Sequence, residues 1–170
     1  MENSQRLLQF NQTIQIWIDA VDDYSLEQLQ RPPRQGDWSL GQVYRHLLDD
    51  TEWFVGQMRE ALTATENVHQ EMHADAKRMF ASNGFPDIQI QGPATNTFIP
   101  QPESKEELRQ GLIAIREAVN GLFGKATHSS GKTRHPGLQY FSAGEWLQFA
   151  EMHLRHHLRQ KARIDEVLWP

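Results

Sequence analysis

Apolar residues recur at intervals of three and four along four long stretches of this chain, which polar or proline-rich segments separate. In the first stretch, Leu7, Phe10, Ile14, Trp17 and Val21 follow this spacing. Such spacing places the apolar side chains on one stripe of a helix. The sequence therefore predicts four amphipathic helices, over about 5–22, 39–63, 104–123 and 142–167.

Three of these helices begin with a serine that is followed three residues later by glutamine or glutamate. The pairs are Ser39 with Gln42, Ser104 with Glu107, and Ser142 with Glu145. In a capping box of this kind the serine accepts a hydrogen bond from the third helical amide, and the longer side chain reaches back to the serine amide. Two of these helix starts also have an apolar residue before the serine that can pack on one in the first turn of the helix, a hydrophobic staple. The pairs are Trp38 with Val43 and Phe141 with Trp146. At the other end of the third helix, Gly124 is suited to cap it.

The connection between the second and third helices, about 64–103, is unusually long. A weaker helical pattern covers 69–80, and several Gly and Pro residues then interrupt the chain. The segment 88–91 alternates briefly but is too short to predict a sheet. A loop of this length suggests either the wall or lid of a site or an insertion. We therefore predict an all-α fold with a single domain, 1–170: a four-helix bundle with a long loop and a short helix inserted between the second and third main helices.

Composition narrows the classes of function. The 170 residues carry a net charge of −5, which gives no electrostatic support to nucleic-acid binding. No apolar run approaches the roughly 18–20 residues that span a bilayer, and the first residues do not resemble a secretory signal. We therefore expect a cytoplasmic protein with no membrane or nucleic-acid partner. Cysteine is absent, which excludes disulfides, thiolate ligands and a nucleophilic cysteine of the chain's own.

Histidines occupy the middle of the apolar stripe of the fourth helix. The stripe consists of Trp146, Ala150, His153, His157, Gln160, Ile164 and Leu168. Burying imidazoles without partners costs on the order of a few kcal/mol, so a partner must satisfy them. His153 and His157 lie one helical turn apart, with about 6 Å between their β-carbons, and can converge on one ion. His46, on the core side of the second helix, can supply a third nitrogen.

Three neutral imidazoles suit Zn(II), Ni(II), Fe(II) or Mn(II) and leave a coordination position open for water or an exchangeable ligand. We expect Zn or Ni first, with Fe or Mn as further candidates. Gln160 is expected to hydrogen-bond a ligand or contact the substrate. Asp50, one turn after His46, is expected to orient that imidazole.

A second interpretation of the same histidines involves no metal: a His-x-x-x-His pair arises by chance fairly often and can simply be packed and hydrogen-bonded. His156 points about 100° away from His157 and is the substitute ligand if the register differs. We expect ordinary, non-ligand positions for His69, His73, His128 and His135. We expect a solvated helix face for Arg155, Arg159 and Arg163, and core or helix-start positions for Trp17, Trp38, Trp53 and Trp146. The chain contains no His-Glu-x-x-His motif, which argues against peptidase chemistry.

Three segments of the chain resemble the DinB-like superfamily, the metal-binding four-helix bundles that include bacillithiol-transferase-type proteins. The first, 31–47, contains Trp38-Ser and ends in His46-Leu; the second, 135–146, leads into the last helix; the third, 153–160, is His-Leu-Arg-His-His-Leu-Arg-Gln. The resemblance spans most of the chain in helix order. It implies a metal site at His46, His153 and His157. It also implies thiol-dependent transfer or isomerisation for some members, with bacillithiol, mycothiol or a related thiol.

These observations lead to a functional hypothesis. We expect a metal-dependent thiol S-transferase, or a related hydrolase or isomerase, that acts on a small-molecule substrate. Because the chain has no cysteine, a low-molecular-weight thiol cofactor would supply any sulfur nucleophile. No general base is evident, and Asp50 and Glu151 are the nearest acidic residues. Family members often pair through helix faces, which suggests a homodimer. The alternative is a non-enzymatic, metal-stabilised bundle that serves as a stress-response binding or dimerisation module.

Overall fold

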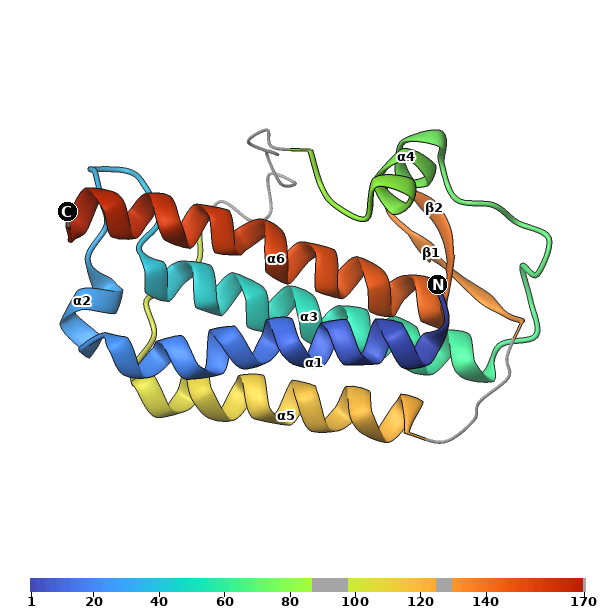
Figure 1. Ribbon diagram of the computed structural model, residues 1–170, viewed down its shortest axis with the longest axis horizontal. Coiled ribbons are helices and arrows are strands. Elements are labelled where there is room, and N and C mark those ends of the chain that lie inside the picture. Colours follow the sequence, from blue (N-terminus) through green and yellow to red (C-terminus); the bar gives the residue numbers. More distant parts are fainter. Residues whose placement is uncertain (87–97, 125–129, 170) are drawn as a thin grey trace.

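The computed structural model describes residues 1–86, 98–124 and 130–169. Four long helices lie side by side in it: α1 (Asn3–Ala20), α3 (Leu40–Thr63), α5 (Lys105–Phe123) and α6 (Ala143–Leu168) (Figure 1). Their bounds agree with the predicted stretches to within two residues at each end. The prediction of an all-α four-helix bundle is therefore confirmed.

The order of the helices around the bundle is α1–α6–α3–α5, because α1 and α3 each pack against both α6 and α5. Helices α1 and α6 run in one direction and α3 and α5 in the other (Figure 1). Since α3 and α5 are parallel neighbours, the chain between them must return along the length of the bundle. The long connection at 64–103 provides this return. The sequence interpretation, which weighed a lid against an insertion, did not include this topological need.

Short helices occupy two connections. A 3₁₀ helix η1 (Val21–Asp23) and helix α2 (Leu26–Gln30) follow α1, and neither was predicted. Helix α4 (Ala74–Ser82) begins five residues later than the predicted helical segment at 69–80. Its start is fixed by the His73 side chain, which accepts a hydrogen bond from the amide of Asp75. Its end is fixed by Asn83, whose φ of 49° is left-handed and stops the helix.

A β-hairpin, which the sequence did not predict, precedes α6. Strands β1 (Lys132–His135) and β2 (Gln139–Ser142) pair antiparallel, with Lys132 opposite Ser142 and His135 opposite Gln139. Four residues per strand are too few to produce a recognisable alternation. The amide of His73 donates to the carbonyl of Leu138, which joins the start of α4 to this hairpin. The brief alternation at 88–91 lies outside the described residues.

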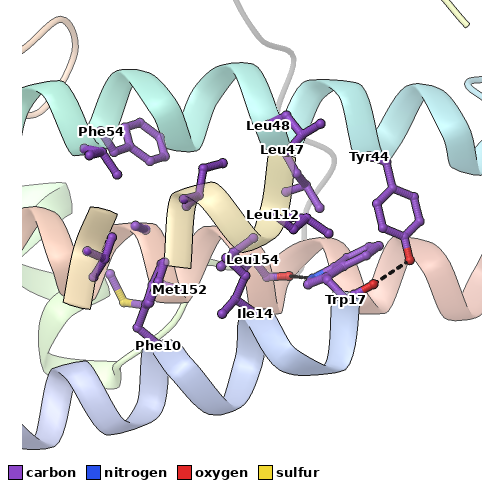
Figure 2. Close-up of a cluster of buried hydrophobic side chains, with 14 of the residues drawn as sticks. Phe10, Ile14, Trp17, Tyr44, Leu47, Leu48, Phe54, Leu112, Met152 and Leu154 are labelled. Atoms are coloured by element: carbon purple, nitrogen blue, oxygen red, sulfur yellow. Dashed lines mark hydrogen bonds between the residues drawn. The ribbon is translucent and has the colours of Figure 1, made fainter. Parts of the chain in front are cut away.

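The core joins α1, α3 and α6 through two large aromatic side chains (Figure 2). Trp17 is fully buried and donates from Nε1 to the carbonyl of Leu154 at 3.1 Å. Tyr44 is also fully buried, and its hydroxyl donates to the carbonyl of Trp17 at 3.0 Å. A buried Trp or Tyr contributes a large apolar area and needs a partner for its polar atom. These two hydrogen bonds link α3 to α1 and α1 to α6, and the bond to α6 is made at Leu154, the residue after His153.

Candidate metal centre

Helices α3 and α6 bring together the three histidines that the sequence singled out. Within the described residues, His46, His153 and His157 form a group whose ligand atoms all lie within 4.8 Å of one another. All three are buried, with exposed fractions of 9%, 7% and 9%. The substitute ligand His156 does not join them. Its Nδ1 lies 2.9 Å from a guanidinium nitrogen of Arg159.

Gln160 fixes the orientation of His157. The amide oxygen of Gln160 lies 2.7 Å from Nδ1 of His157. Because an amide oxygen only accepts, Nδ1 carries the ring proton and the lone pair of His157 is on Nε2. That Nε2 atom lies 3.2 Å from Nε2 of His153. Gln160 therefore makes the hydrogen bond to a candidate ligand that the sequence predicted. By holding the proton on Nδ1, it leaves the lone pair of His157 on the nitrogen that faces the other histidines.

Burial keeps the three rings neutral. It lowers the pKa of His157 to about 3 and the pKa of His153 well below its ordinary value. Burial also lowers the pKa of His46, although the nearby Asp50 carboxylate acts in the opposite direction. Neutral imidazole is the form that binds a metal ion, because the lone pair is free. At pH 7 the cluster therefore presents metal-binding nitrogens without competition from protons.

The residues present fit a divalent metal ion. Nε2 of His153 and Nε2 of His157 lie 3.2 Å apart, which is close to the separation of two ligands of one four-coordinate ion. Three imidazole nitrogens are also a donor set that Zn(II), Ni(II) and Fe(II) accept. The chemistry and the spacing of the cluster thus both agree with a metal centre.

Asp50 lies on the side of the cluster to which the ring nitrogens point. Its Oδ2 is 3.5 Å from Nε2 of His46 and 3.6 Å from Nε2 of His153, the same atom of His153 that faces His157. The expected contact between Asp50 and His46 is present, although both distances are longer than a hydrogen bond. The Asp50 side chain is 32% exposed, whereas the His46 side chain beside it is 10% exposed. Burial raises the pKa of Asp50, with His46 acting in the opposite direction.

The sequence profile of the DinB superfamily matches residues 9–160. The chain belongs to the DinB superfamily. A search of curated proteins finds no match. Among solved structures, the DinB-superfamily chain is similar to YfiT from Bacillus subtilis, described as "a probable metal-dependent hydrolase with an unusual four-helix bundle topology". The TM-score is 0.66 at 15% sequence identity, over 97% of this chain and 86% of YfiT. At this identity the likeness shows the fold. No helix in the described part of the chain is long and apolar enough to cross a membrane.

Aromatic side chains surround the histidines of this DinB-superfamily chain. The rings of Trp38 and Phe54 lie 5.3 Å from His46 and 5.5 Å from His153, respectively, between centroids. Phe85, which follows α4, lies 6.0 Å from His153. Apolar walls of this kind strengthen electrostatic interactions inside a site. Trp53 differs from its expected core position, since it is 43% exposed.

His135 has a position that the sequence interpretation missed. Its ring packs within 5.5 Å of Phe141, Trp146 and Phe149, and its Nδ1 accepts from the amides of Gly137 and Leu138. Burial lowers its pKa to about 4. The only sequence signal was the His-Pro-Gly turn itself, which shows the turn but not the aromatic contacts. Of the other histidines, His69 is exposed and His73 caps α4, while His128 lies outside the described residues.

We expect His135→Asn to make the stability of the metal-free protein less sensitive to acid. Since the folded pKa of His135 is below the unfolded value of about 6.5, unfolding takes up a proton between about pH 6.5 and 4, and stability falls as the pH drops through this window. Asparagine keeps an acceptor for the turn amides but does not titrate there. The slope of stability against pH should decrease by up to about 1.4 kcal/mol per pH unit, less any solvent screening of the half-buried ring.

Urea unfolding in EDTA at several pH values measures this slope. His69→Asn, a change at an exposed histidine, is the matched control and should leave the slope unchanged. Parallel pH curves for wild type and His135→Asn would contradict the assignment.

Arg155, whose side chain is 43% exposed, forms an ion pair with the buried Glu151. Glu151 is 4% exposed and accepts from Arg155 and from the Thr13 hydroxyl on α1, at 2.9 Å in each case. Arg155 also donates to the carbonyl of Asn83 at 2.6 Å. Arg155 is therefore only partly solvated, as its contacts with Glu151 and Asn83 hold it against the bundle. Both Glu151 oxygens are occupied by these contacts, which makes Glu151 a structural residue and removes it as a candidate base.

Proposed function

We propose that this DinB-superfamily chain is a metal-dependent enzyme whose ion is bound by His46, His153 and His157. A divalent ion in this position lowers the pKa of a bound water or thiol and so supplies a nucleophile near neutral pH. The observation that carries the proposal is the convergence of three buried, neutral imidazoles, one of which has its lone pair directed inward by Gln160. We keep Zn or Ni as the first candidate metals, with Fe or Mn next.

The chain's own side chains would position and shield the reacting groups. Trp38, Phe54 and Phe85 exclude water from the histidine rings. The half-buried Asp50 marks the side from which a small-molecule substrate reaches the centre. Gln160 keeps His157 in one tautomer, so that the ligand geometry is ready before substrate binds. We further propose a cytoplasmic homodimer that binds neither nucleic acid nor membrane.

The nature of the nucleophile separates two reactions. Activated water gives hydrolysis, the class named in the description of the structural neighbour YfiT. A low-molecular-weight thiol of the bacillithiol or mycothiol type gives S-transfer or isomerisation. The absence of cysteine requires any such thiol to arrive as a separate molecule. Added thiol is therefore the variable that distinguishes the two reactions.

Metal content tests the proposal first. Mass spectrometry of untagged wild type should find close to one Zn, Ni, Fe or Mn ion per chain. His153→Ala/His157→Ala should contain none. The matched control is His69→Ala/His73→Asn, which alters an exposed pair with the same four-residue spacing and keeps a capping side chain for α4. This control should bind metal like wild type. A folded wild type that stays empty when offered these metals would contradict the metal centre and the enzyme together.

Activity of loaded and EDTA-treated protein follows, on ester, amide and epoxide substrates with and without added thiol. Turnover that needs metal but no thiol indicates a hydrolase, and turnover that needs both indicates a thiol transferase. Tight metal binding without solvent exchange or turnover would support the alternative, a non-enzymatic bundle that the ion stabilises.

A further inference from the structure

We propose that Asp50 is a fourth protein ligand of the metal centre, through Oδ2, so that the site is His₃Asp rather than His₃. This inference rests on the proposed metal-dependent function and deepens it. It concerns the acidic residue one turn after His46 on α3, which the expected three-histidine site does not include.

The spacing of the atoms supports a fourth ligand. With metal–nitrogen and metal–oxygen distances of about 2.0–2.2 Å, two ligands of one four-coordinate ion lie about 3.3 Å apart. Nε2 of His153 and Nε2 of His157 are 3.2 Å apart. Oδ2 of Asp50 lies 3.5 Å from Nε2 of His46 and 3.6 Å from Nε2 of His153. The distances from the Asp50 oxygen to these two nitrogens are therefore close to the distance expected between two ligands of one ion.

A direct hydrogen bond does not account for the position of Asp50 beside these rings. Hydrogen bonds between N and O measure about 2.7–3.2 Å, whereas Oδ2 of Asp50 is 3.5 Å from Nε2 of His46 and 3.6 Å from Nε2 of His153. One carboxylate oxygen thus faces two ring nitrogens, which come from two different helices, at nearly equal distances. A cation shared by the three atoms accounts for this arrangement.

The charge of the ion also favours a carboxylate ligand. A divalent ion bound by three neutral imidazoles keeps its full charge in a buried, aromatic-lined site, which is costly without a compensating anion. Among the neighbouring acidic groups, Glu151 is occupied by Thr13 and Arg155, and Asp49 is exposed. Asp50 lies within 4 Å of two of the three histidines and is the carboxylate placed to compensate the ion.

A fourth protein ligand changes the expected coordination. Four protein ligands complete a tetrahedral zinc site and leave no position for water or substrate. Catalysis at a His₃Asp centre therefore needs an ion that accepts five or six ligands, which favours Ni(II), Fe(II) or Mn(II) over four-coordinate zinc.

Cobalt substitution tests this proposal without an activity assay. Metal-free wild type, Asp50→Asn and Asp50→Ala are titrated with Co(II) against a chromophoric chelator, and the visible spectrum of each complex is recorded. Asp49→Asn is the matched control, since it removes the same charge from the adjacent position. We expect both Asp50 variants to lose at least about tenfold in Co(II) affinity and to change the position and intensity of the cobalt bands. Asp49→Asn should keep the wild-type spectrum and nearly the wild-type affinity.

The outcomes separate this inference from the proposed function. Wild-type affinity and spectrum in Asp50→Asn, with binding still abolished in His153→Ala/His157→Ala, would overturn the fourth ligand and leave the three-histidine centre intact. An equal loss in Asp49→Asn and Asp50→Asn with unchanged bands would show a through-space charge effect and would also overturn it. A wild type that binds no cobalt would contradict the proposed function itself. Far-ultraviolet circular dichroism of each metal-free variant confirms that affinities are compared between folded proteins.

Discussion

Addition of the bound metal to EDTA-treated protein is expected to raise the free energy of unfolding by about 4 kcal/mol once the free ion reaches roughly 1,000 times its Kd. The reason is that the ligands come from two helices, His46 from α3 and the pair His153 and His157 from α6. The unfolded chain does not hold these residues together, so the ion binds the folded state and stabilises it by mass action.

Urea unfolding followed by circular dichroism, with and without metal, measures the gain. Each variant is compared with its own metal-free form, so any cost of the substitution itself cancels. His153→Ala/His157→Ala should show no gain, and His69→Ala/His73→Asn should show the full gain. An equal gain in the His153/His157 variant would mean that the ion binds and stabilises the protein elsewhere.

Replacing Arg155 by alanine is expected to destabilise the protein by about 2–3 kcal/mol. Loss of one partner from a fully buried ion pair costs about 3–5 kcal/mol, and the 43% exposure of the Arg155 side chain lowers this figure because solvent screens the pair. The substitution leaves the Glu151 carboxylate buried with Thr13 as its remaining hydrogen-bond donor. It also removes the donor to the Asn83 carbonyl at the end of α4.

A second substitution tests this explanation. Glu151→Gln in the Arg155→Ala background removes the unpaired charge and keeps an acceptor for Thr13, so it should recover part of the lost stability. Arg59→Ala, at an exposed arginine on α3, should change stability by less than about 0.5 kcal/mol. If Glu151→Gln recovers nothing, the buried charge is not the source of the loss.

The long helices were predictable because two independent local signals agreed, apolar spacing and capping residues. The reciprocal boxes at Ser39 and Ser142 formed as predicted. At Ser104 only half of the box formed: the serine accepts from the amide of Glu107, but the Glu107 carboxylate accepts from the amide of Glu103 and pairs with Arg45. The same signature at Ser25 was missed, because a helix of five residues is too short to show a period.

The histidine cluster was predictable in part for the same reason. His153 and His157 lie on the apolar stripe of their helix, so their burial follows from the period of the sequence. Spacing places Asp50 one turn from His46, and the contact between them is present. Spacing does not show that the same carboxylate also faces His153, which lies on another helix. The roles of His135 and Arg155 depend on residues brought near by the fold, namely Phe141, Phe149 and Asn83.

The separation of the ligands along the chain also determines when a metal ion can be acquired. His46 is synthesised more than a hundred residues before His153 and His157. Until α6 has been synthesised and has packed against α3, a nascent protein offers an ion either His46 alone or His46 and the α6 pair far apart, without the contact between Phe54 and His153. Metal uptake would therefore follow assembly of the bundle rather than guide its early steps, and the cell would have to supply the ion to a chain that is already folded.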